Sequence, residues 1–89
     1  MWDAAWGYLP ASGAGAILVG EFGTKYQTES DRQWLGGLAA YIAANELSFT
    51  YWSLNPNSGD TGGILADDWV TVHEDKLAVI RPLLAPLLP

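Results

Sequence analysis

The stretch AILVGEFGTKY, residues 16–26, decides how the rest of the chain is interpreted. It opens with an apolar run without clean alternation, the pattern of a strand buried on both faces in a parallel sheet. The run leads directly into a carboxylate, Glu21, which Phe22 and Gly23 follow. Carboxylates are rarely buried without a partner. Glu21 therefore either pairs with Lys25 or a helix start, or it belongs to a functional site.

A helix and a second strand follow this first strand. Ser30 and Gln33 have the spacing of a capping box, which predicts a helix over residues 30–45 with Asn45 as its left-handed terminator. Residues 47–55, LSFTYWSLN, alternate small polar with bulky side chains and predict a strand. Apolar side chains at helical spacing predict the core face of the helix: Trp34, Leu35, Leu38, Tyr41 and Ile42.

Two further helices are predicted near the ends of the chain. Residues 2–9 have helical spacing, and we expect this helix to stop at Pro10. After a loop over residues 56–72, a last helix is expected within residues 73–84, with Asp75 to Arg81 as its body because Pro82 ends it.

The order of elements predicts an α/β fold in a single domain over residues 1–89. A strand–helix–strand crossover implies parallel strands, which need cover on both faces. Two such strands cannot cover themselves, and each leaves an unpaired edge. We therefore expect either that several copies associate or that the chain is part of a larger barrel.

Composition excludes several kinds of partner. The net charge is −6, and the four basic residues are scattered, which argues against nucleic acid and against a basic membrane-binding face. The absence of cysteine excludes disulfides and thiolate metal sites.

The start of the chain lacks the features of a signal peptide. The apolar tail, residues 77–89, is too short and too interrupted by Arg81 and proline to span a bilayer.

Three segments resemble a known family. ILVGEFG (17–23), YWSLNPNSGDTGGIL (51–65) and DDW (67–69) are similar to the C-terminal portion of glycoside hydrolase family 5, in its bacterial endoglucanase (cellulase) branch. The resemblance runs from about Trp2 to about Leu84 and implies a partial (β/α)₈ TIM barrel, completed by oligomerisation or by a missing N-terminal portion. The implied elements are the end of helix six (1–9), strand seven (16–23), helix seven (30–45), strand eight (47–55) and helix eight (73–84).

The resemblance also implies an activity. It points to a secreted, retaining endo-β-1,4-glucanase that acts on β-glucan or cello-oligosaccharide and needs no cofactor or metal. Glu21 would be the catalytic nucleophile, and Trp52 would be the aromatic platform on which a glucosyl ring rests. The peptide bond between Trp52 and Ser53 would be cis.

Side-chain alternation predicts which residues share a face with these two. In the first strand Ile17 and Val19 should point the same way as Glu21, with Leu18 and Phe22 opposite. If the first face lines the barrel, Glu21 emerges at the carboxyl end, where barrel enzymes build their sites. In the second strand the inward residues should be Ser48, Thr50 and Trp52, and the outward ones Phe49 and Tyr51.

A retaining glycosidase needs a second carboxyl group about 5–5.5 Å from the first. In the family it comes from strand four, outside this chain. Glu29 and Asp60 are weaker local candidates, since a solvated acid, a helix cap or a turn residue explains each of them. Asp60 in NSGDTGG is typical of turn chemistry, and the loop lacks the spacing of a calcium site.

Other residues keep two interpretations open. Trp69 is either a second sugar platform or a residue that packs the loop onto the barrel rim, and His73 is expected at the surface.

Two alternatives to an enzyme also remain. One is a non-catalytic carbohydrate-binding fragment that keeps its aromatic residues, and the other is an inactive, self-associating barrel fragment.

Overall fold

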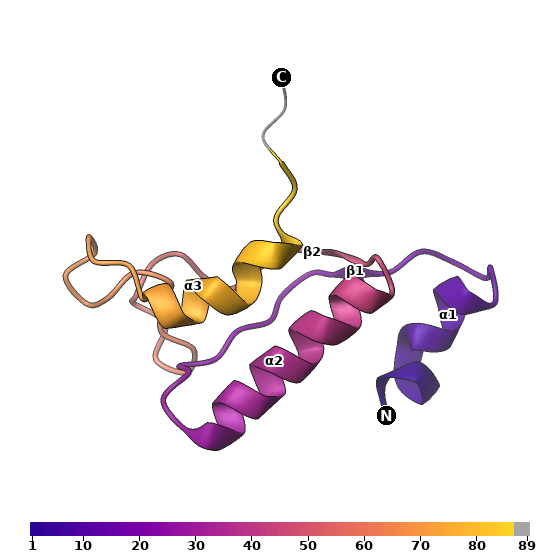
Figure 1. Cartoon of the computed structure of the whole chain (residues 1–89), viewed down its shortest axis with the longest axis horizontal. Helices are drawn as coiled ribbons and strands as arrows, with labels where there is room; N and C mark the ends of the chain where they lie inside the picture. Colours follow the sequence, from indigo (N-terminus) through magenta and orange to yellow (C-terminus); the bar gives the residue numbers. More distant parts are fainter. Residues whose placement is uncertain (87–89) are drawn as a thin grey trace.

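A computed structural model describes residues 1–86 (Figure 1), so residues 87–89 of the apolar tail lie outside the described part. None of the helices in the described part is long and apolar enough to cross a membrane. In chain order the elements are a π-helical turn Asp3–Gly7, α1 Tyr8–Ala11, β1 Leu18–Val19, α2 Glu29–Ala44, β2 Ser48–Phe49, α3 Glu74–Ile80 and a 3₁₀ turn Arg81–Leu83.

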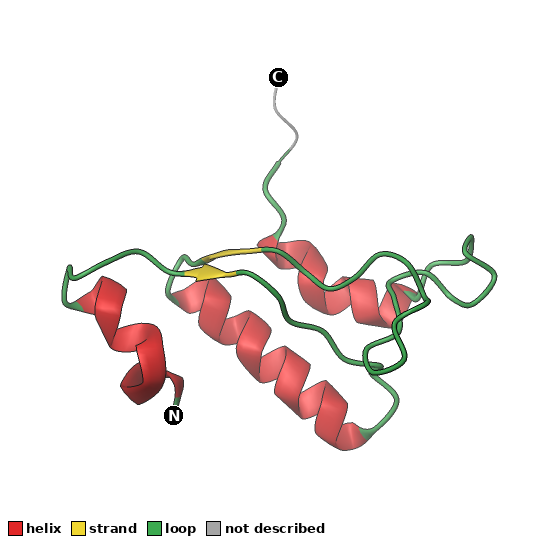
Figure 2. Ribbon diagram, turned by 180° about the vertical axis from the view of Figure 1, so that it is seen from behind, coloured by secondary structure: helices red, strands yellow, loops and turns green. Residues whose placement is uncertain are grey.

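The two strands are parallel, as predicted, and lie side by side (Figure 2). Leu18 pairs with Ser48 and Val19 with Phe49, so both strands are shorter than the predicted 16–23 and 47–55. The backbone bonding nevertheless continues, because the Thr50 N–H donates to the Val19 carbonyl and the Trp52 N–H to the Phe22 carbonyl, both at 2.9 Å.

These two hydrogen bonds reveal an extra residue in the first segment. Between them the chain advances from Thr50 to Trp52 on one side but from Val19 to Phe22 on the other. One unmatched residue is the signature of a β-bulge, which disrupts the ladder and reverses the side-chain alternation beyond it. The bulge explains why the regular strand ends at Val19.

The bulge also corrects the predicted alternation in the first strand. Val19 packs against the helices, while Leu18 is 63% exposed on the opposite face. Past the bulge, Phe22 is buried and Glu21 is exposed. Leu18, not Val19, therefore shares the open face with Glu21.

The alternation predicted for the second strand is confirmed. Phe49 and Tyr51 pack against the core, whereas Ser48, Thr50 and Trp52 are exposed. The β2 segment has no bulge between Phe49 and Tyr51, so simple alternation holds there.

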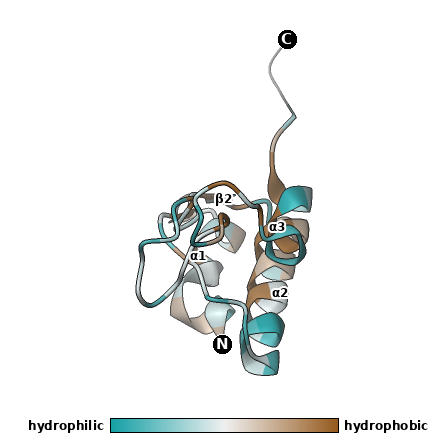
Figure 3. Ribbon diagram, turned by 90° about the vertical axis from the view of Figure 1, so that its left-hand side faces the viewer, coloured by the Kyte–Doolittle hydropathy of each residue, from teal (hydrophilic) through white to brown (hydrophobic). Residues whose placement is uncertain are grey.

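The core lies between the strands and a layer formed by α2 and α3, which Figure 3 shows together on one side of the strands. Phe22 contributes from the strand side, with T-shaped ring contacts at centroid distances of 5.8 Å to Phe49 and 5.2 Å to Tyr51. The other core residues come from the helices: Leu35, Leu38, Ile42 and Ile80. Trp34 was expected in this core but is 40% exposed, because it lies beside the buried stripe.

The helix α2 begins earlier than predicted. Thr28 is its N-cap and forms a capping box with Asp31, so the expected box of Ser30 and Gln33 is wrong. The Thr28 hydroxyl accepts from the Asp31 N–H at 3.1 Å, and the Asp31 carboxylate accepts in return from the Thr28 N–H at 3.4 Å. A threonine followed three residues later by a short acid satisfies the same orphan amides as the predicted pair.

The end of α2 also differs by one residue. Asn45 has φ −102°, and the left-handed residue is Glu46 with φ 52°. The Glu46 N–H donates to the Ala43 carbonyl and the Leu47 N–H to the Ile42 carbonyl. These two bonds form a Schellman motif, whose geometry requires the left-handed residue at this position.

The N-terminal helix extends one residue past the expected stop at Pro10, to Ala11. Pro10 is the third residue of α1, which continues directly from the π-helical turn Asp3–Gly7. Gly13, with φ 74°, ends this helical segment. The preceding turn is anchored to α2 by Trp2 and Trp6, whose rings lie 5.3 Å and 5.5 Å from that of Tyr41.

Candidate active site at the carboxyl ends of the two strands

Glu21 and Trp52 lie at the same edge of the two-stranded sheet. Each follows the carboxyl end of its strand, and parallel strands end on the same side. The Trp52 N–H donates to the carbonyl of Phe22, the residue directly after Glu21. The Thr50 hydroxyl donates to the Gly20 carbonyl, the residue directly before it. The backbone on both sides of Glu21 is thus tied to the Trp52 segment.

Gly23 permits this close approach. A Cβ atom at this position would lie 1.8 Å from the carbonyl oxygen of Trp52, a distance that no side chain tolerates. Gly20, in contrast, has open space around it. Gly23 was quoted in the sequence motif, but its role depends on a backbone contact that sequence spacing does not reveal.

Glu21 itself is exposed on the open face of the sheet. The pairing with Lys25 that the sequence left open is not formed, because the sole ion pair within residues 1–86 joins Arg81 and Glu74 at 3.9 Å. The carboxylate is therefore available to a molecule that approaches from the open face.

Trp52 is 47% exposed beside it. The peptide bond from Trp52 to Ser53 is cis, as the resemblance implied. The indole Nε1–H donates to the Ser58 hydroxyl at 3.3 Å, and that hydroxyl donates to Asp60 Oδ1 at 2.7 Å. The sequence interpretation did not single out Ser58; its place two residues before Asp60 in a turn was the available signal.

The two local candidates for a second acid have other partners. Glu29 is the first residue of α2, and Oε1 accepts from the Gln33 amide at 3.5 Å. Asp60 accepts from Ser58, and this hydrogen bond is the main reason why the pKa of its carboxyl group is lowered. A general acid needs a raised pKa, so the environment of Asp60 favours a different role.

Trp69 lies in a hairpin-like loop closed by the bridge between Leu65 and Val72, which Figure 1 shows as the projecting loop that leads into α3. Its side chain is 51% exposed and its φ is 64°. Asp68 orders this turn: hydrogen bonds from the Thr71 hydroxyl, the Thr71 N–H and the Val70 N–H lower its pKa to about 2.

Lys76, in α3, holds the loop after β2 in place, a role that the sequence did not predict. It is buried, with 1% of its surface exposed, and its Nζ donates to the carbonyls of Thr61 and Gly63 at 3.1 Å each. Burial lowers the pKa of its ammonium group. From the sequence alone, a lysine on this helix is expected at the surface. The groups that Lys76 binds are backbone carbonyls of a different segment, the loop after β2, and sequence spacing does not reveal such contacts.

Within the described part of the chain, no group of three or more His, Asp or Glu side chains is arranged to hold a metal ion. His73 is exposed and N-terminal to α3, as predicted.

Comparison with known proteins identifies the family. The model for cellulase (glycosyl hydrolase family 5) matches residues 1–58. The chain therefore belongs to glycosyl hydrolase family 5, and it matches the C-terminal portion of endoglucanases of that family.

Individual relatives agree in sequence and in fold. The chain is 46% identical over 90 residues to an endoglucanase of Paenibacillus polymyxa, covering 99% of this chain and 23% of the relative. It is 43% identical to the major extracellular endoglucanase of Xanthomonas campestris pv. campestris, covering 93% of this chain and 17% of the relative. An endocellulase of Pyrococcus horikoshii, solved in complex with cellotetraose, superposes with a TM-score of 0.86 at 40% identity, covering 92% of this chain and 23% of that one.

The chain thus spans about a quarter or less of the length of these relatives. The fold it shares with them is a piece of a barrel, two parallel strands with their helices on the outer side.

Proposed function

We propose that the chain supplies the nucleophile side of a retaining endo-β-1,4-glucanase site, with Glu21 as nucleophile and Trp52 as sugar platform. The observation that carries this proposal is the joined geometry of the two strand ends. The backbone hydrogen bond from Trp52 to Phe22 holds an exposed carboxylate and an exposed indole at one edge of the sheet. The match to family 5 supports β-1,4-glucan as the substrate class.

In the proposed reaction the Glu21 carboxylate attacks the anomeric carbon as the glycosidic C–O bond breaks. The departing oxygen takes a proton from a second carboxylic acid, which then removes a proton from water as that water hydrolyses the glycosyl–enzyme ester. The indole of Trp52 offers an apolar face for a sugar ring beside the reacting bond. Trp69, exposed at its loop tip, is proposed as a second and more distant platform.

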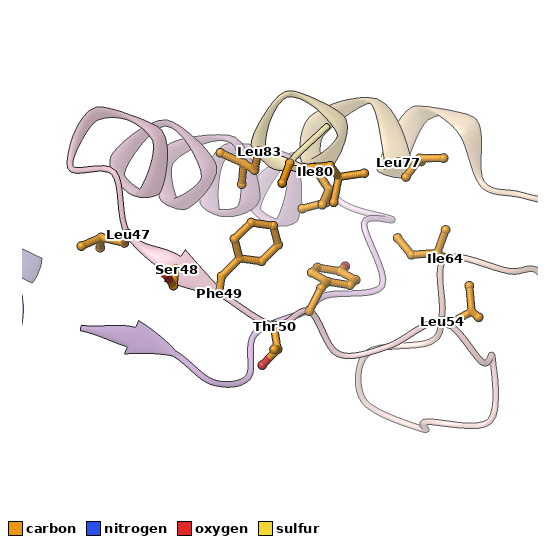
Figure 4. A pocket seen from close by; sticks show the side chains of 12 residues that line it. Leu47, Ser48, Phe49, Thr50, Leu54, Ile64, Leu77, Ile80 and Leu83 are labelled. Atoms are coloured by element: carbon orange, nitrogen blue, oxygen red, sulfur yellow. The ribbon is translucent and has the colours of Figure 1, made fainter. Parts of the chain in front are cut away.

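The second acid is proposed to come from an N-terminal barrel portion that docks on this chain. Two observations support such a partner: β2 has a free edge, and an apolar groove of about 670 Å³ runs along it beneath α3 (Figure 4). The groove is lined by Leu47, Phe49, Tyr51, Leu54, Ile64, Leu77, Ile80 and Leu83. Unpaired strand edges and apolar grooves are covered in stable proteins.

A completed barrel tests this proposal. We suggest a chimera in which this chain replaces the matching quarter of the Paenibacillus polymyxa endoglucanase, here called the completed barrel. We expect it to hydrolyse cello-oligosaccharides and to lose at least about 10³-fold in kcat with Glu21→Gln, since a nucleophile acts as part of a unit. Glu46→Gln, which removes an equivalent charge from the turn after α2, is the matched control. Hydrolysis that survives Glu21→Gln would discard the assignment.

Carbohydrate binding without turnover is the second candidate function. Two observations favour it: Trp52 and Trp69 are exposed, and both local candidates for a second acid, Glu29 and Asp60, accept hydrogen bonds from neighbouring side chains. Titration of the 89-residue chain with cellotetraose separates the two candidates. Binding that Trp52→Ala abolishes, with no hydrolysis in the completed barrel, would favour this function. Light scattering in the same buffer shows whether copies of the chain associate through the groove instead.

Secretion is proposed as well. It rests on the relative from Xanthomonas campestris, which is named an extracellular endoglucanase.

A further inference from the structure

We propose that Asp60 is a positioning residue that, acting through the Ser58 hydroxyl, holds the indole of Trp52 in the orientation that receives a sugar ring. This inference rests on the proposed function for the value of the orientation, but the orientation can be measured without any sugar. The contacts that carry it are the 3.3 Å hydrogen bond from the indole to Ser58 and the 2.7 Å hydrogen bond from Ser58 to Asp60.

The chemistry of the three groups fixes the direction of this relay. An indole N–H can only donate, and an ionised carboxylate can only accept. A hydroxyl has a single proton, and in Ser58 that proton goes to Asp60. The hydroxyl oxygen therefore presents its lone pairs to the Trp52 N–H, and each member of the relay is satisfied in one arrangement. Without the carboxylate, the Ser58 proton is free to turn toward the indole.

Asp60 keeps the charge that this role requires. The hydrogen bond from Ser58 is the largest cause of its lowered pKa, and the positive charge of Lys25 contributes a smaller part in the same direction. The carboxylate is therefore ionised throughout the neutral range. Hydrogen bonds to an ionised acceptor are shorter and roughly twice as strong as neutral ones, in agreement with the short second step of the relay.

The loop that carries Ser58 and Asp60 is itself held in place. The Gly62 N–H donates to the Ser58 carbonyl at 2.9 Å, and the buried Lys76 binds the carbonyls of Thr61 and Gly63. The Ile64 N–H then donates to the carbonyl of Ser53, the residue after Trp52, at 2.9 Å. The base of the relay is thus tied to α3 and to the backbone of Ser53, the neighbour of the residue that it orients.

Fixing the ring matters because a side chain that is already ordered loses less entropy on binding. The indole is half exposed and its described polar contact is the one to Ser58. Ordering one free side chain reduces affinity by about three- to tenfold. We therefore expect loss of the relay to weaken cellotetraose binding by about that factor, with KM raised more than kcat is lowered.

The test follows the indole Nε1–H resonance of Trp52 by NMR, in the sugar-free 89-residue chain and in the completed barrel. Loss of one signal in Trp52→Phe assigns the resonance. We expect Asp60→Ala and Ser58→Ala each to shift this resonance and to speed its exchange with water, and Asp60→Asn, which keeps an acceptor oxygen, to restore part of the effect. Asp67→Ala removes an exposed acid from the neighbouring loop and is the matched control.

The outcomes separate this inference from the proposed function. An unmoved Trp52 resonance in both Asp60→Ala and Ser58→Ala, with the remaining spectrum intact, would overturn the relay. Should either variant unfold, the other and Asp60→Asn still decide the question. A resonance that moves as expected, while Trp52→Ala leaves cellotetraose affinity unchanged, supports the relay but refutes Trp52 as a sugar platform.

Discussion

The two faces of the β1–β2 pair differ in how completely they are covered. The outer face meets α2 and α3 and buries Phe22, Leu35 and Ile42. The inner face is open, with Leu18 63% and Trp52 47% exposed beside the exposed Glu21. The outer face is packed against the helices apart from the apolar groove along β2, whereas the inner face is open. The same segment thus combines a layer packed against the helices with an open face on which the proposed site lies.

The largest expected difference between the faces is energetic. Leu35→Ala should lower the free energy of unfolding of the chain by about 2–5 kcal/mol, because Leu35 is fully buried and its removal leaves a cavity. Leu18→Ala is the matched change on the open face and should alter it by less than about 0.5 kcal/mol. Urea unfolding of both variants measures this. In the completed barrel, Leu18→Ala should lower the free energy of unfolding substantially. In the isolated chain, an equal loss for both leucines would show that the two faces do not differ in burial.

A second expected effect lies at the junction of the faces. Gly23→Ala should destabilise the chain by about 1–3 kcal/mol, because the added methyl group would meet the Trp52 carbonyl and push the strand ends apart. Gly20→Ala, with open space around it, is the control. Thermal unfolding and the intrinsic fluorescence of the tryptophans report both the loss and the displaced indole. If the two alanine variants behave alike, the close approach at Gly23 is not a constraint.

A smaller effect concerns the start of α2 on the outer side. Thr28→Ala should cost about 0.5–2 kcal/mol, since it removes one half of the capping box with Asp31. Ser30→Ala, within the first turn of the helix, removes a hydroxyl that does not cap it and should cost less than about 0.5 kcal/mol. Denaturant midpoints of the two variants compare them directly. A larger loss in Ser30→Ala than in Thr28→Ala would instead support Ser30, the cap predicted from the sequence.

The smallest expected effect is the pH dependence of the loop that carries Trp69. The pKa of Asp68 falls from 3.8 to about 2 on folding, so the unfolded chain binds more protons in this range. The stability contributed by Asp68 is therefore complete above pH 3.8 and is lost as the pH falls toward 2. Asp68→Ala should lower the melting temperature slightly at pH 7, and the difference should vanish near pH 2. A difference that persists unchanged at pH 2 would count against the turn contacts.

The sequence predicted the parts of this fold that depend on local pattern. Alternation placed Phe49 and Tyr51 against the helices correctly, and helical spacing found Leu35, Leu38 and Ile42. It failed in the first strand, because a single unmatched residue between Val19 and Phe22 reverses the alternation, and such a bulge depends on the partner strand.

Within the site, the same limit applies. Glu21 and Trp52 were predicted from their motifs and remain proposals, whereas Ser58 and Lys76 were not predicted, because their contacts run across a loop. The bulge has a consequence for the proposed site that neither motif reveals. It leaves Glu21 on the open face while the next residue, Phe22, is returned to the core.

The most direct test of Glu21 as the nucleophile is to trap the proposed glycosyl–enzyme bond. The completed barrel would be incubated with an activated 2-deoxy-2-fluoro-cellobioside, whose fluorine slows the hydrolysis of the intermediate, and digested for mass spectrometry. We expect one fluorocellobiosyl adduct, on the peptide that contains Glu21, and no adduct in Glu21→Gln. An adduct on a different carboxylate of the completed barrel, in a preparation that hydrolyses cellotetraose, would contradict this assignment.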